Sequence, residues 1–307
     1  MSISFGDRER LAAQSLLALA IDEDLAHVGD LTSQTVIPVD SRGRVQIVSR
    51  KRGVLSGLPI VSMVYAAIGG NLQNGQDTDG SEIVITPQCQ DGDILEPGTI
   101  IATLTGSVRT LLTGERTALN FLTLLSGTAT LTLQFVEAVK GTHAKILDTR
   151  KTLPGYRALQ KYAVRCGGGM NHRQGLYDAV MIKDNHLAAW VRDPSHSIAD
   201  AVRSAREAVP EETMVIVEVD TLDQLRLVLP ACPDVVLLDN MPTSQLIEAV
   251  SIRNRVARSV ALEASGGVNL KTIREIAETG VDRISIGALT HSAPALDLGF
   301  DWPVASR

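Results

Sequence analysis

Charged or glycine-rich clusters follow six short apolar runs in the second part of this chain of 307 residues. The runs with their clusters are KILDTRKT (145–152), AVMIKDNH (179–186), MVIVEVD (214–220), VVLLDN (235–240), ALEASGG (261–267) and RISIGA (283–288). Continuous Val, Ile and Leu runs are typical of parallel strands that are buried on both faces. Short connections and right-handed crossovers bring the carboxyl ends of such strands to one side. We therefore expect the six clusters to form one rim.

The cationic members of this rim predict a site for a small ligand with several negative charges. Arg150 and Lys151 follow the first run, and Lys183 follows the second. His172 and Arg173 come after the glycine run GGGMN. Like charges that converge in a cleft repel one another unless an anion neutralises them. Arginine forks suit planar carboxylates and phosphates, whereas lysines act as point charges. Each residue taken singly also fits a solvated surface charge, and the shared position at strand ends favours a site.

Two carboxylates and two glycine turns complete the rim. Glu218 and Asp239 end successive runs, which suits Mg²⁺ delivered with a polyphosphate or a cation that develops during a reaction. A carboxylate that simply pairs with a nearby lysine is the structural alternative. The histidines are scattered without the spacing of zinc ligands. Glycines in SGG (265–267) and IGAL (286–289) let backbone amides approach an anion, and many barrels bind phosphate after their last strands.

Composition narrows the class of protein. Hydrophobic residues make up 44% and aromatic residues 3% of the chain, so the core must be aliphatic, as is usual in α/β folds. The net charge of −6 argues against nucleic-acid binding. The first ten residues lack an apolar segment, and no stretch of 18 apolar residues is free of charge. Three cysteines without paired spacing are typical of reduced thiols. We expect a cytoplasmic protein with neither a membrane nor a nucleic-acid partner.

The chain changes character near residue 114. Apolar and polar residues alternate in 42–57 and 79–112 between Gly, Asp and Pro turns, which predicts antiparallel strands. Helices are predicted from Leu11 to Leu25 and from Pro59 to Ile68. Residues 1–113 are therefore predicted to form a small, sandwich-like N-terminal α+β domain. The lipoyl-like stretch GDILEPGTIIATLTG has no lysine at its turn, so we interpret it as structural.

Helices and strands alternate after this point. The stretch 113–141 predicts a helix that Thr113 caps and Gly141 ends. Later helices are predicted in SIADAVRSAREAVP, TLDQLRLVLP, TSQLIEAVSIRNR and NLKTIREIAETG. Residues 114–290 are thus predicted to form an α/β barrel with mostly parallel strands. Only six strands are evident, so the barrel is incomplete or two strands lie in segments interpreted as helix or loop. We expect residues 291–307 to form a tail that packs back on the N-terminal domain.

Several segments resemble one enzyme family in sequence. They are GERTALNFLTLLSGTAT (114–130), DTRKTLPGYRALQKYAVRCGGGMNHRQGLYDAVMIKDNH (148–186), VEVDTLDQ (217–224), LLDNM (237–241), LEASGGV (262–268) and DRISIGALTHS (282–292). They are similar to nicotinate-nucleotide pyrophosphorylase [carboxylating], also called quinolinate phosphoribosyltransferase, and the similarity spans nearly the whole chain. The resemblance implies a type II phosphoribosyltransferase fold and a step of de novo NAD biosynthesis. Quinolinate and phosphoribosyl pyrophosphate would give nicotinate mononucleotide, pyrophosphate and CO₂.

The resemblance also implies roles for individual residues. The groups that hold the two carboxylates of quinolinate would be Arg150, His172, Arg173 and Lys183, with Arg116 reaching in from the neighbouring subunit. The groups that face the phosphates of the sugar donor would be Lys151 and Lys183. The site of the 5-phosphate would consist of Ser265, Gly266, Gly267 and Gly287. Thr149 belongs to the same implied substrate site. Catalytic roles are implied for Lys151, Lys183, Glu218 and Asp239.

The resemblance implies one cofactor and one assembly. Glu218 and Asp239 match the pair that contacts the ribose hydroxyls and Mg²⁺, directly or through water. Carboxylates there would favour the oxocarbenium-like sugar that forms as pyrophosphate leaves, while lysines and Mg²⁺ neutralise the leaving group. A homodimer, or a higher assembly, is expected because the family's first domain covers the mouth of the partner's barrel. Arg116 would otherwise be isolated from its own rim.

Three alternatives stay open at this point. A related phosphoribosyltransferase could act on another acceptor, such as nicotinate, or serve molybdenum metabolism, and would need fewer carboxylate-holding groups. A barrel lyase could form a Schiff base through Lys151 or Lys183. A sugar-phosphate binding protein without catalysis would have little use for both Glu218 and Asp239.

Overall fold

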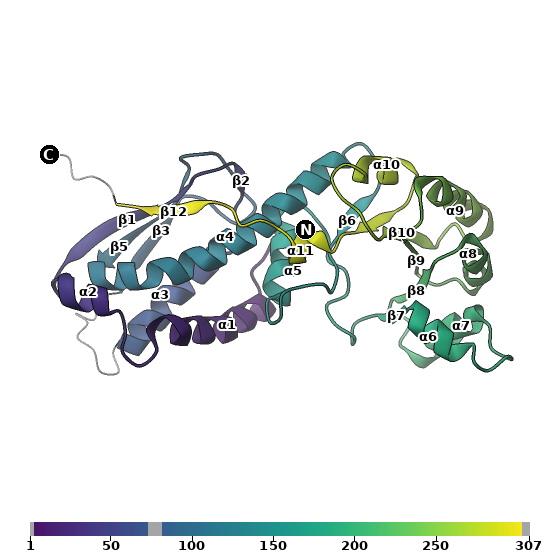
Figure 1. The fold of residues 1–307 in the computed structure, drawn as a ribbon, viewed down its shortest axis with the longest axis horizontal. Helices are drawn as coiled ribbons and strands as arrows, with labels where there is room; N and C mark the ends of the chain where they lie inside the picture. Colours follow the sequence, from purple (N-terminus) through teal and green to yellow (C-terminus); the bar gives the residue numbers. More distant parts are fainter. Residues whose placement is uncertain (1–2, 73–81, 303–307) are drawn as a thin grey trace. The chain divides into compact units, whose positions relative to one another are not determined.

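The structure is a computed structural model that describes residues 3–72 and 82–302. The chain divides into two compact units, each with its own sheet (Figure 1). Unit 1 comprises Met1–Leu133, Thr152–Gly168 and Ser292–Arg307. Unit 2 comprises Gln134–Lys151 and Gly169–His291.

Unit 1 is built on an antiparallel sheet with strand order β12-β1-β5-β3, beside a two-stranded sheet of β2 and β4. Its strands are β1 (Arg42–Ser49), β2 (Gly53–Val54), β3 (Val84–Pro87), β4 (Ile94–Leu95), β5 (Ile100–Ser107) and β12 (Leu298–Asp301). Its helices, with α4 running on into unit 2, are α1 (Asp7–Leu25), α2 (Leu31–Val36), α3 (Leu58–Leu72), α4 (Val108–Ala138) and α5 (Arg157–Cys166). One apolar cluster fills its core with mostly aliphatic side chains. The predicted α+β class of this part is therefore correct. Residues 79–81 of the predicted strand segment 79–112 lie outside the described residues.

Helix α4 differs from the prediction at both ends. It begins at Val108, so Thr113 lies inside the helix and does not cap it. The Thr113 hydroxyl donates back to the carbonyl of Arg109 at 2.9 Å, as threonines inside helices do. The helix ends at Ala138, and Gly141 with φ +88° follows in the left-handed region that favours glycine. The predicted domain boundary after residue 113 thus falls within α4, and the division at residues 113 and 290 stays a prediction.

Two further features of unit 1 concern its edges. Strand β12 pairs with β1 in antiparallel register, so the segment after residue 291 adds a strand to the sheet formed by the first part of the chain. Helix α4 is long and apolar enough to cross a membrane by length and composition alone, with mean hydropathy 1.3 over its best window. In that window 56% of the residues are buried inside the protein, which favours a core helix.

Unit 2 is a parallel sheet of six strands, all of which fall within the six predicted runs. They are β6 (Lys145–Leu147), β7 (Val180–Ile182), β8 (Val215–Val219), β9 (Val235–Asp239), β10 (Ala261–Ser265) and β11 (Arg283–Ser285). The alternating helices are α6 (Asp184–Trp190), α7 (Ile198–Ala208), α8 (Leu222–Val228), α9 (Thr243–Val256), α10 (Ile273–Glu278) and α11 (Ala288–His291), with a 3₁₀ turn η1 (Leu229–Ala231) after α8. Ser197 and Thr221 cap α7 and α8 with their side chains.

The strand order β6-β11-β10-β9-β8-β7 is the cyclic order of a barrel that is opened between β6 and β7. A single parallel bridge joins Leu147 of β6 to Met170 at this opening. Among residues 3–72 and 82–302, no further strand extends the sheet there. The predicted incomplete α/β barrel is therefore correct, and the alternative of two hidden strands is wrong. The segment around Met170 enters the opening, which places residues 171–173 beside the sheet.

Side chains of the barrel strands alternate between two environments. Ile216, Val235 and Leu237 form an interior apolar cluster. Glu218 follows Ile216 by two residues, and Asp239 follows Leu237 by two residues, so both carboxylates share the face of that cluster. Glu263 shares it too, because it lies opposite Leu237 in the ladder of β9 and β10. The interior of the barrel therefore combines aliphatic and ionisable groups.

Candidate functional site

The predicted rim exists at the carboxyl ends of the barrel strands. Asp239 is the last residue of β9, and Ser265, the last of β10, lies opposite it in the ladder. Lys183 directly follows β7 and begins the turn into α6. Its ammonium donates to Glu218 Oε2 at 2.8 Å, with 45% of the lysine side chain and 10% of the glutamate side chain exposed. The structural alternative of a lysine–carboxylate pair thus holds for Glu218.

Arg150 and Arg173 place two positive charges within electrostatic range of each other at the site. Burial, followed by the positive charge of Arg150, lowers the pKa of the Arg173 guanidinium below its ordinary value. The Nε atoms of both arginines are buried and have no hydrogen-bond partner within the described residues. Arg173 Nη1 donates to the carbonyl of Ala179 at 3.2 Å, which fixes one end of its fork. Two guanidinium groups held within electrostatic range, with buried donors to spare, suit an anion.

The segment that carries His172 and Arg173 is fixed by a carboxylate that the sequence analysis did not single out. Asp148, fully buried directly after β6, accepts from the His172 backbone at 2.9 Å and from the Asn171 side chain at 2.6 Å. His172 Nδ1 accepts from the Arg173 backbone at 2.7 Å. The other ring nitrogen therefore carries the proton. Asp148 is the first residue of DTRKT, so the charged cluster that predicted the rim after β6 already included this carboxylate.

Glu263 was also missed, because its position within the apolar run of β10 indicated only a strand. It is fully buried, and Oε1 lies 3.3 Å from His172 Nε2. Its Oε2 lies 2.8 Å from Nε of Arg283 on the neighbouring strand β11. Burial alone would raise the pKa of Glu263, but contacts with His172, Arg283 and Ser285 outweigh it and hold the pKa below its ordinary value. The barrel interior thus contains an ionised carboxylate that lies at ion-pair distance from Arg283 and beside the His172 ring.

The two glycine turns differ in the atoms that surround their glycines. Gly266 has φ +96°, and a Cβ there would lie 2.1 Å from the side-chain oxygen of Asn240, so only glycine fits. Gly267 has φ +61° with open space around its missing Cβ, which leaves its backbone accessible. At Gly287 a Cβ would lie 3.1 Å from Cδ of Lys151, so this glycine gives room to the Lys151 side chain.

Backbone contacts hold the Lys151 turn against the end of β11. The Thr149 hydroxyl accepts from the Lys151 backbone amide at 3.0 Å. The Lys151 carbonyl accepts from the Thr290 hydroxyl of α11 at 2.8 Å. The structure therefore brings the predicted phosphate-facing lysine together with the second predicted glycine turn.

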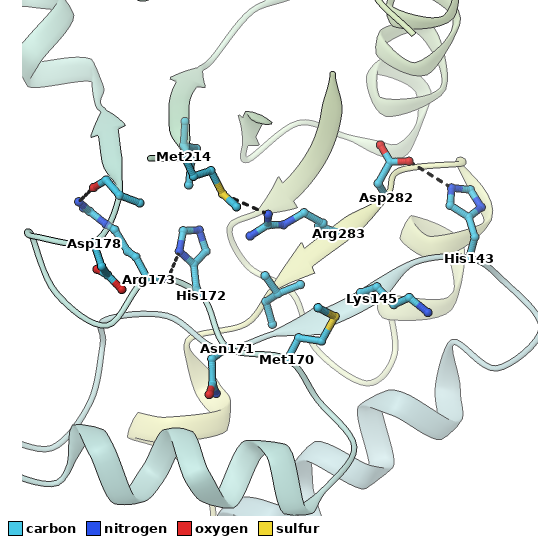
Figure 2. A pocket seen from close by; sticks show the side chains of 13 residues that line it. His143, Lys145, Met170, Asn171, His172, Arg173, Asp178, Met214, Asp282 and Arg283 are labelled. Atoms are coloured by element: carbon cyan, nitrogen blue, oxygen red, sulfur yellow. Dashed lines mark hydrogen bonds and ion pairs between the residues drawn. The ribbon is translucent and has the colours of Figure 1, made fainter. Parts of the chain in front are cut away.

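A pocket of about 560 Å³ opens in unit 2 beside these groups (Figure 2). Its lining includes His172 and Arg173, but also residues at the amino ends of strands, such as Lys145 and Arg283. Figure 2 shows the His172 ring between Arg173 and Arg283. The rim residues on β8, β9 and β10 do not line it. The pocket thus includes His172 and Arg173 but not the rim residues of β8, β9 and β10, of which Glu218 is buried and Asp239 and Ser265 are half-buried.

One predicted site residue belongs to the other unit, and the described residues contain no dedicated metal cage. Arg116 is an exposed residue of α4 in unit 1, whereas every other predicted site residue belongs to unit 2. A dedicated metal cage is also missing, since the described residues contain no group of three or more His, Cys, Asp or Glu side chains that could hold an ion. Glu218 and Asp239 therefore fit Mg²⁺ only as two carboxylates that would share it with substrate oxygens and water.

An open α/β barrel with cations, two carboxylates and glycine turns at the carboxyl ends of its strands defines an enzyme that acts on a phosphorylated, anionic substrate. Two family models match the chain: quinolinate phosphoribosyl transferase, N-terminal domain, over residues 30–126, and C-terminal domain, over residues 128–301. The chain belongs to the quinolinate phosphoribosyltransferase family and is a pentosyltransferase of that class.

Individual relatives support this assignment along the whole chain. The nicotinate-nucleotide pyrophosphorylase [carboxylating] of Mycobacterium leprae is 44% identical over 295 residues, covering 96% of this chain and 99% of the relative. A probable nicotinate-nucleotide pyrophosphorylase [carboxylating] of Bacillus subtilis is 39% identical, covering 93% and 91%. The solved structure of the nicotinate-nucleotide pyrophosphorylase from Francisella tularensis superposes with a TM-score of 0.83 at 39% identity, covering 94% and 95%. The family resemblance inferred from the motifs is thereby confirmed.

Proposed function

We propose that this protein transfers the phosphoribosyl group of phosphoribosyl pyrophosphate to quinolinate and releases pyrophosphate and CO₂. The product is nicotinate mononucleotide, a precursor in de novo NAD synthesis. The observation that carries the proposal is the pair Arg150 and Arg173, whose buried Nε atoms lack partners among the residues described. A dicarboxylate such as quinolinate supplies two acceptor groups at once. Nicotinate, with one carboxylate, would leave part of this cationic set without a partner.

Different residues of the rim bind different parts of the two substrates. Arg150, His172, Arg173 and Lys183 hold and orient the two carboxylates, so that the ring nitrogen faces the sugar. Glu218 and Asp239 face the ribose, where positive charge develops as the bond to pyrophosphate breaks. Backbone amides of the turn at Ser265, Gly266 and Gly267, together with Gly287, hold the 5-phosphate. Lys151, which passes over Gly287, neutralises charge on the phosphates of the donor.

The ring itself supplies the electron sink for decarboxylation. Attack of the ring nitrogen on the sugar carbon leaves that nitrogen cationic, and loss of the adjacent carboxylate as CO₂ leaves an electron pair on the ring carbon. A proton then completes nicotinate mononucleotide. The protein orients the departing carboxylate and excludes water. No covalent nucleophile is required, because the cationic ring stabilises the electron pair.

Mg²⁺ is the proposed cofactor, with Glu218 and Asp239 binding it directly or through water. When bound, it would neutralise negative charge on the pyrophosphate group. Glu218 is available only in part, because Lys183 already donates to Oε2. An ion brought by the substrate fits this arrangement better than a resident one. The proposal also places the enzyme in the cytoplasm, which the free state of all three cysteines favours.

A homodimer or a higher assembly with shared active sites is part of the proposal. Arg116 is exposed on α4, and the proposal assigns it to the quinolinate site of a second copy of the chain. A symmetric two-fold interface would provide two identical sites of this kind.

The test is turnover of quinolinate, measured as CO₂ released and nicotinate mononucleotide formed, with and without phosphoribosyl pyrophosphate. We expect both products in equal amounts, only when both substrates are present. Nicotinate offered instead of quinolinate should give little product, and efficient use of nicotinate would assign a different acceptor. Excess chelator should abolish turnover, and added Mg²⁺ should restore it. Full activity in chelator would refute the metal while leaving the transferase assignment intact.

A further inference from the structure

A chain of contacts leads from the barrel interior to Arg173. Glu263 contacts the His172 ring at Nε2, and the Nδ1 atom of the same ring accepts from the Arg173 backbone. The ring therefore touches Glu263 on one side and the backbone of Arg173 on the other. His172 is buried, so water does not compete effectively for either ring nitrogen.

This chain of contacts opposes a repulsion. Arg150 and Arg173 carry like charges within electrostatic range, and burial makes water a poor screen between them. The neighbouring segment would relieve the repulsion by moving away from β6. Two carboxylates counter that movement: Asp148 holds the backbone of His172, and Glu263 holds its ring. Both are fully buried, and neither is in the set proposed to contact substrate.

Glu263 is also fixed by a cation from the neighbouring strand β11. Arg283 Nε lies 2.8 Å from Oε2, while His172 Nε2 faces Oε1, so the two oxygens serve different elements. The Arg283 side chain is 16% exposed, and its Nη1 lies 3.7 Å from the sulfur of Met214. A buried carboxylate placed between an imidazole and a guanidinium is rigid, because moving toward one partner means losing the other.

We propose that Glu263 is a positioning residue for quinolinate: through the His172 ring it holds Arg173 opposite Arg150 before the substrate arrives. The inference rests on the proposed function and deepens it, since it explains how an empty site keeps two like charges together. Glu263 does not contact the sugar donor in this scheme. Its removal should therefore weaken quinolinate binding selectively.

The test compares Glu263→Gln with wild type in steady-state kinetics. Glutamine has one acceptor oxygen and no charge, so it cannot serve His172 and Arg283 together. We expect the KM for quinolinate to rise about tenfold, as for loss of one charge-assisted contact. The KM for phosphoribosyl pyrophosphate should change less than about twofold. Glu275→Gln, a substitution at an exposed position on α10, is the matched control and should change neither constant.

A double-mutant cycle separates positioning from general damage. Adding Glu263→Gln to an Arg173→Gln background should cost little more than Arg173→Gln alone, because the residue that Glu263 positions is already gone. Independent, multiplying effects of the two substitutions would overturn the proposal. An unchanged KM for quinolinate in folded Glu263→Gln protein would overturn it as well.

A second variant addresses folding. Glu263→Gln leaves Arg283 buried beside a neutral group, so Glu263→Met combined with Arg283→Met removes both charges. The same selective rise in the KM for quinolinate is expected. If neither variant folds, Glu263 supports the fold alone and the positioning role is refuted. Failure of the proposed function would look different, since wild-type protein would then release no CO₂ from quinolinate.

Discussion

Two sets of arginines in unit 2 show opposite electrostatic arrangements. Arg253 and Arg283 are paired: Arg253 Nη1 lies 2.7 Å from Asp282, and Arg283 Nε lies 2.8 Å from Glu263. Arg150 instead lies within electrostatic range of Arg173, and in the part of the chain that is described neither has an ion-pair partner or a hydrogen bond at its buried Nε. The first set joins neighbouring elements of the barrel. The second set forms no such link, and we propose that it binds an anion.

The contrast separates charges that stabilise the fold from charges that await a ligand. Arg253 also donates to the carbonyl of Val260 at 2.7 Å, and Asp282 accepts from the Leu262 amide at 2.7 Å, so the pair ties α9 to the start of β10. Arg150 and Arg173 raise the free energy of the unliganded protein through repulsion and desolvation. We infer that binding energy from the substrate offsets this cost.

The largest effect is expected at the unpaired set. Arg150→Gln should lower kcat/KM for quinolinate by about 10²- to 10³-fold, since a buried carboxylate then loses a charged partner. The free energy of unfolding without ligand should not fall, because one of two repelling charges is gone. Steady-state kinetics and chemical denaturation measure the two quantities on the same preparation.

Arg253→Gln is the matched control and should show the reverse. The free energy of unfolding should fall by about 3 kcal/mol, at the lower end for a broken buried pair because Asp282 is partly exposed. The KM for quinolinate of the folded variant should stay at the wild-type value. If Arg150→Gln destabilised the protein as much as Arg253→Gln, the distinction between the two sets would be lost.

The carboxylates of the rim provide the next test. Asp239→Asn keeps the shape of the side chain and removes its charge, and Asn240 already donates to Asp239 Oδ2 at 2.7 Å. We expect turnover to fall about 10²-fold or more, as when one electrostatic stabiliser is removed. Single-turnover kinetics with saturating substrates measure this directly. Unchanged turnover would mean that Asp239 has only a structural role.

The rim could be predicted from the sequence because the residues that indicate it are neighbours in the chain. Each apolar run and the charge that ends it are neighbours in the chain, so strand ends such as Lys183 and Asp239 could be identified without tertiary contacts. Parallel topology then brings them together. The six strands and the helices α7, α8, α9 and α10 followed from the same local patterns, whereas α6 and α11 were not predicted.

The supporting carboxylates could not be found in this way. Glu263 has a function only through His172 and Arg283, which come from distant parts of the sequence, and inside an apolar run it indicates nothing but a strand. The start of α4 was misplaced because Thr113 has the residue type of a cap, whereas the helix continues back to Val108 from the end of β5. Tertiary packing overrode the local signal in both cases.

The last test asks whether Arg116 acts in its own site or in a partner's, and each mixed dimer should reach at most about half the activity of a wild-type dimer. Arg116→Ala and Glu218→Ala homodimers should each be nearly inactive, the first without a carboxylate clamp and the second without a group that faces the ribose. In a mixed dimer one site inherits both defects and the other inherits neither. Each mixed dimer should therefore regain up to about half the activity of a wild-type dimer if the sites act independently, and an equal mixture after complete exchange about a quarter, because half of its dimers are mixed. Exchange is checked by mass spectrometry, with each variant exchanged against itself as control. If mixed dimers form and activity does not return, Arg116 acts within its own chain, and the shared-site arrangement is wrong.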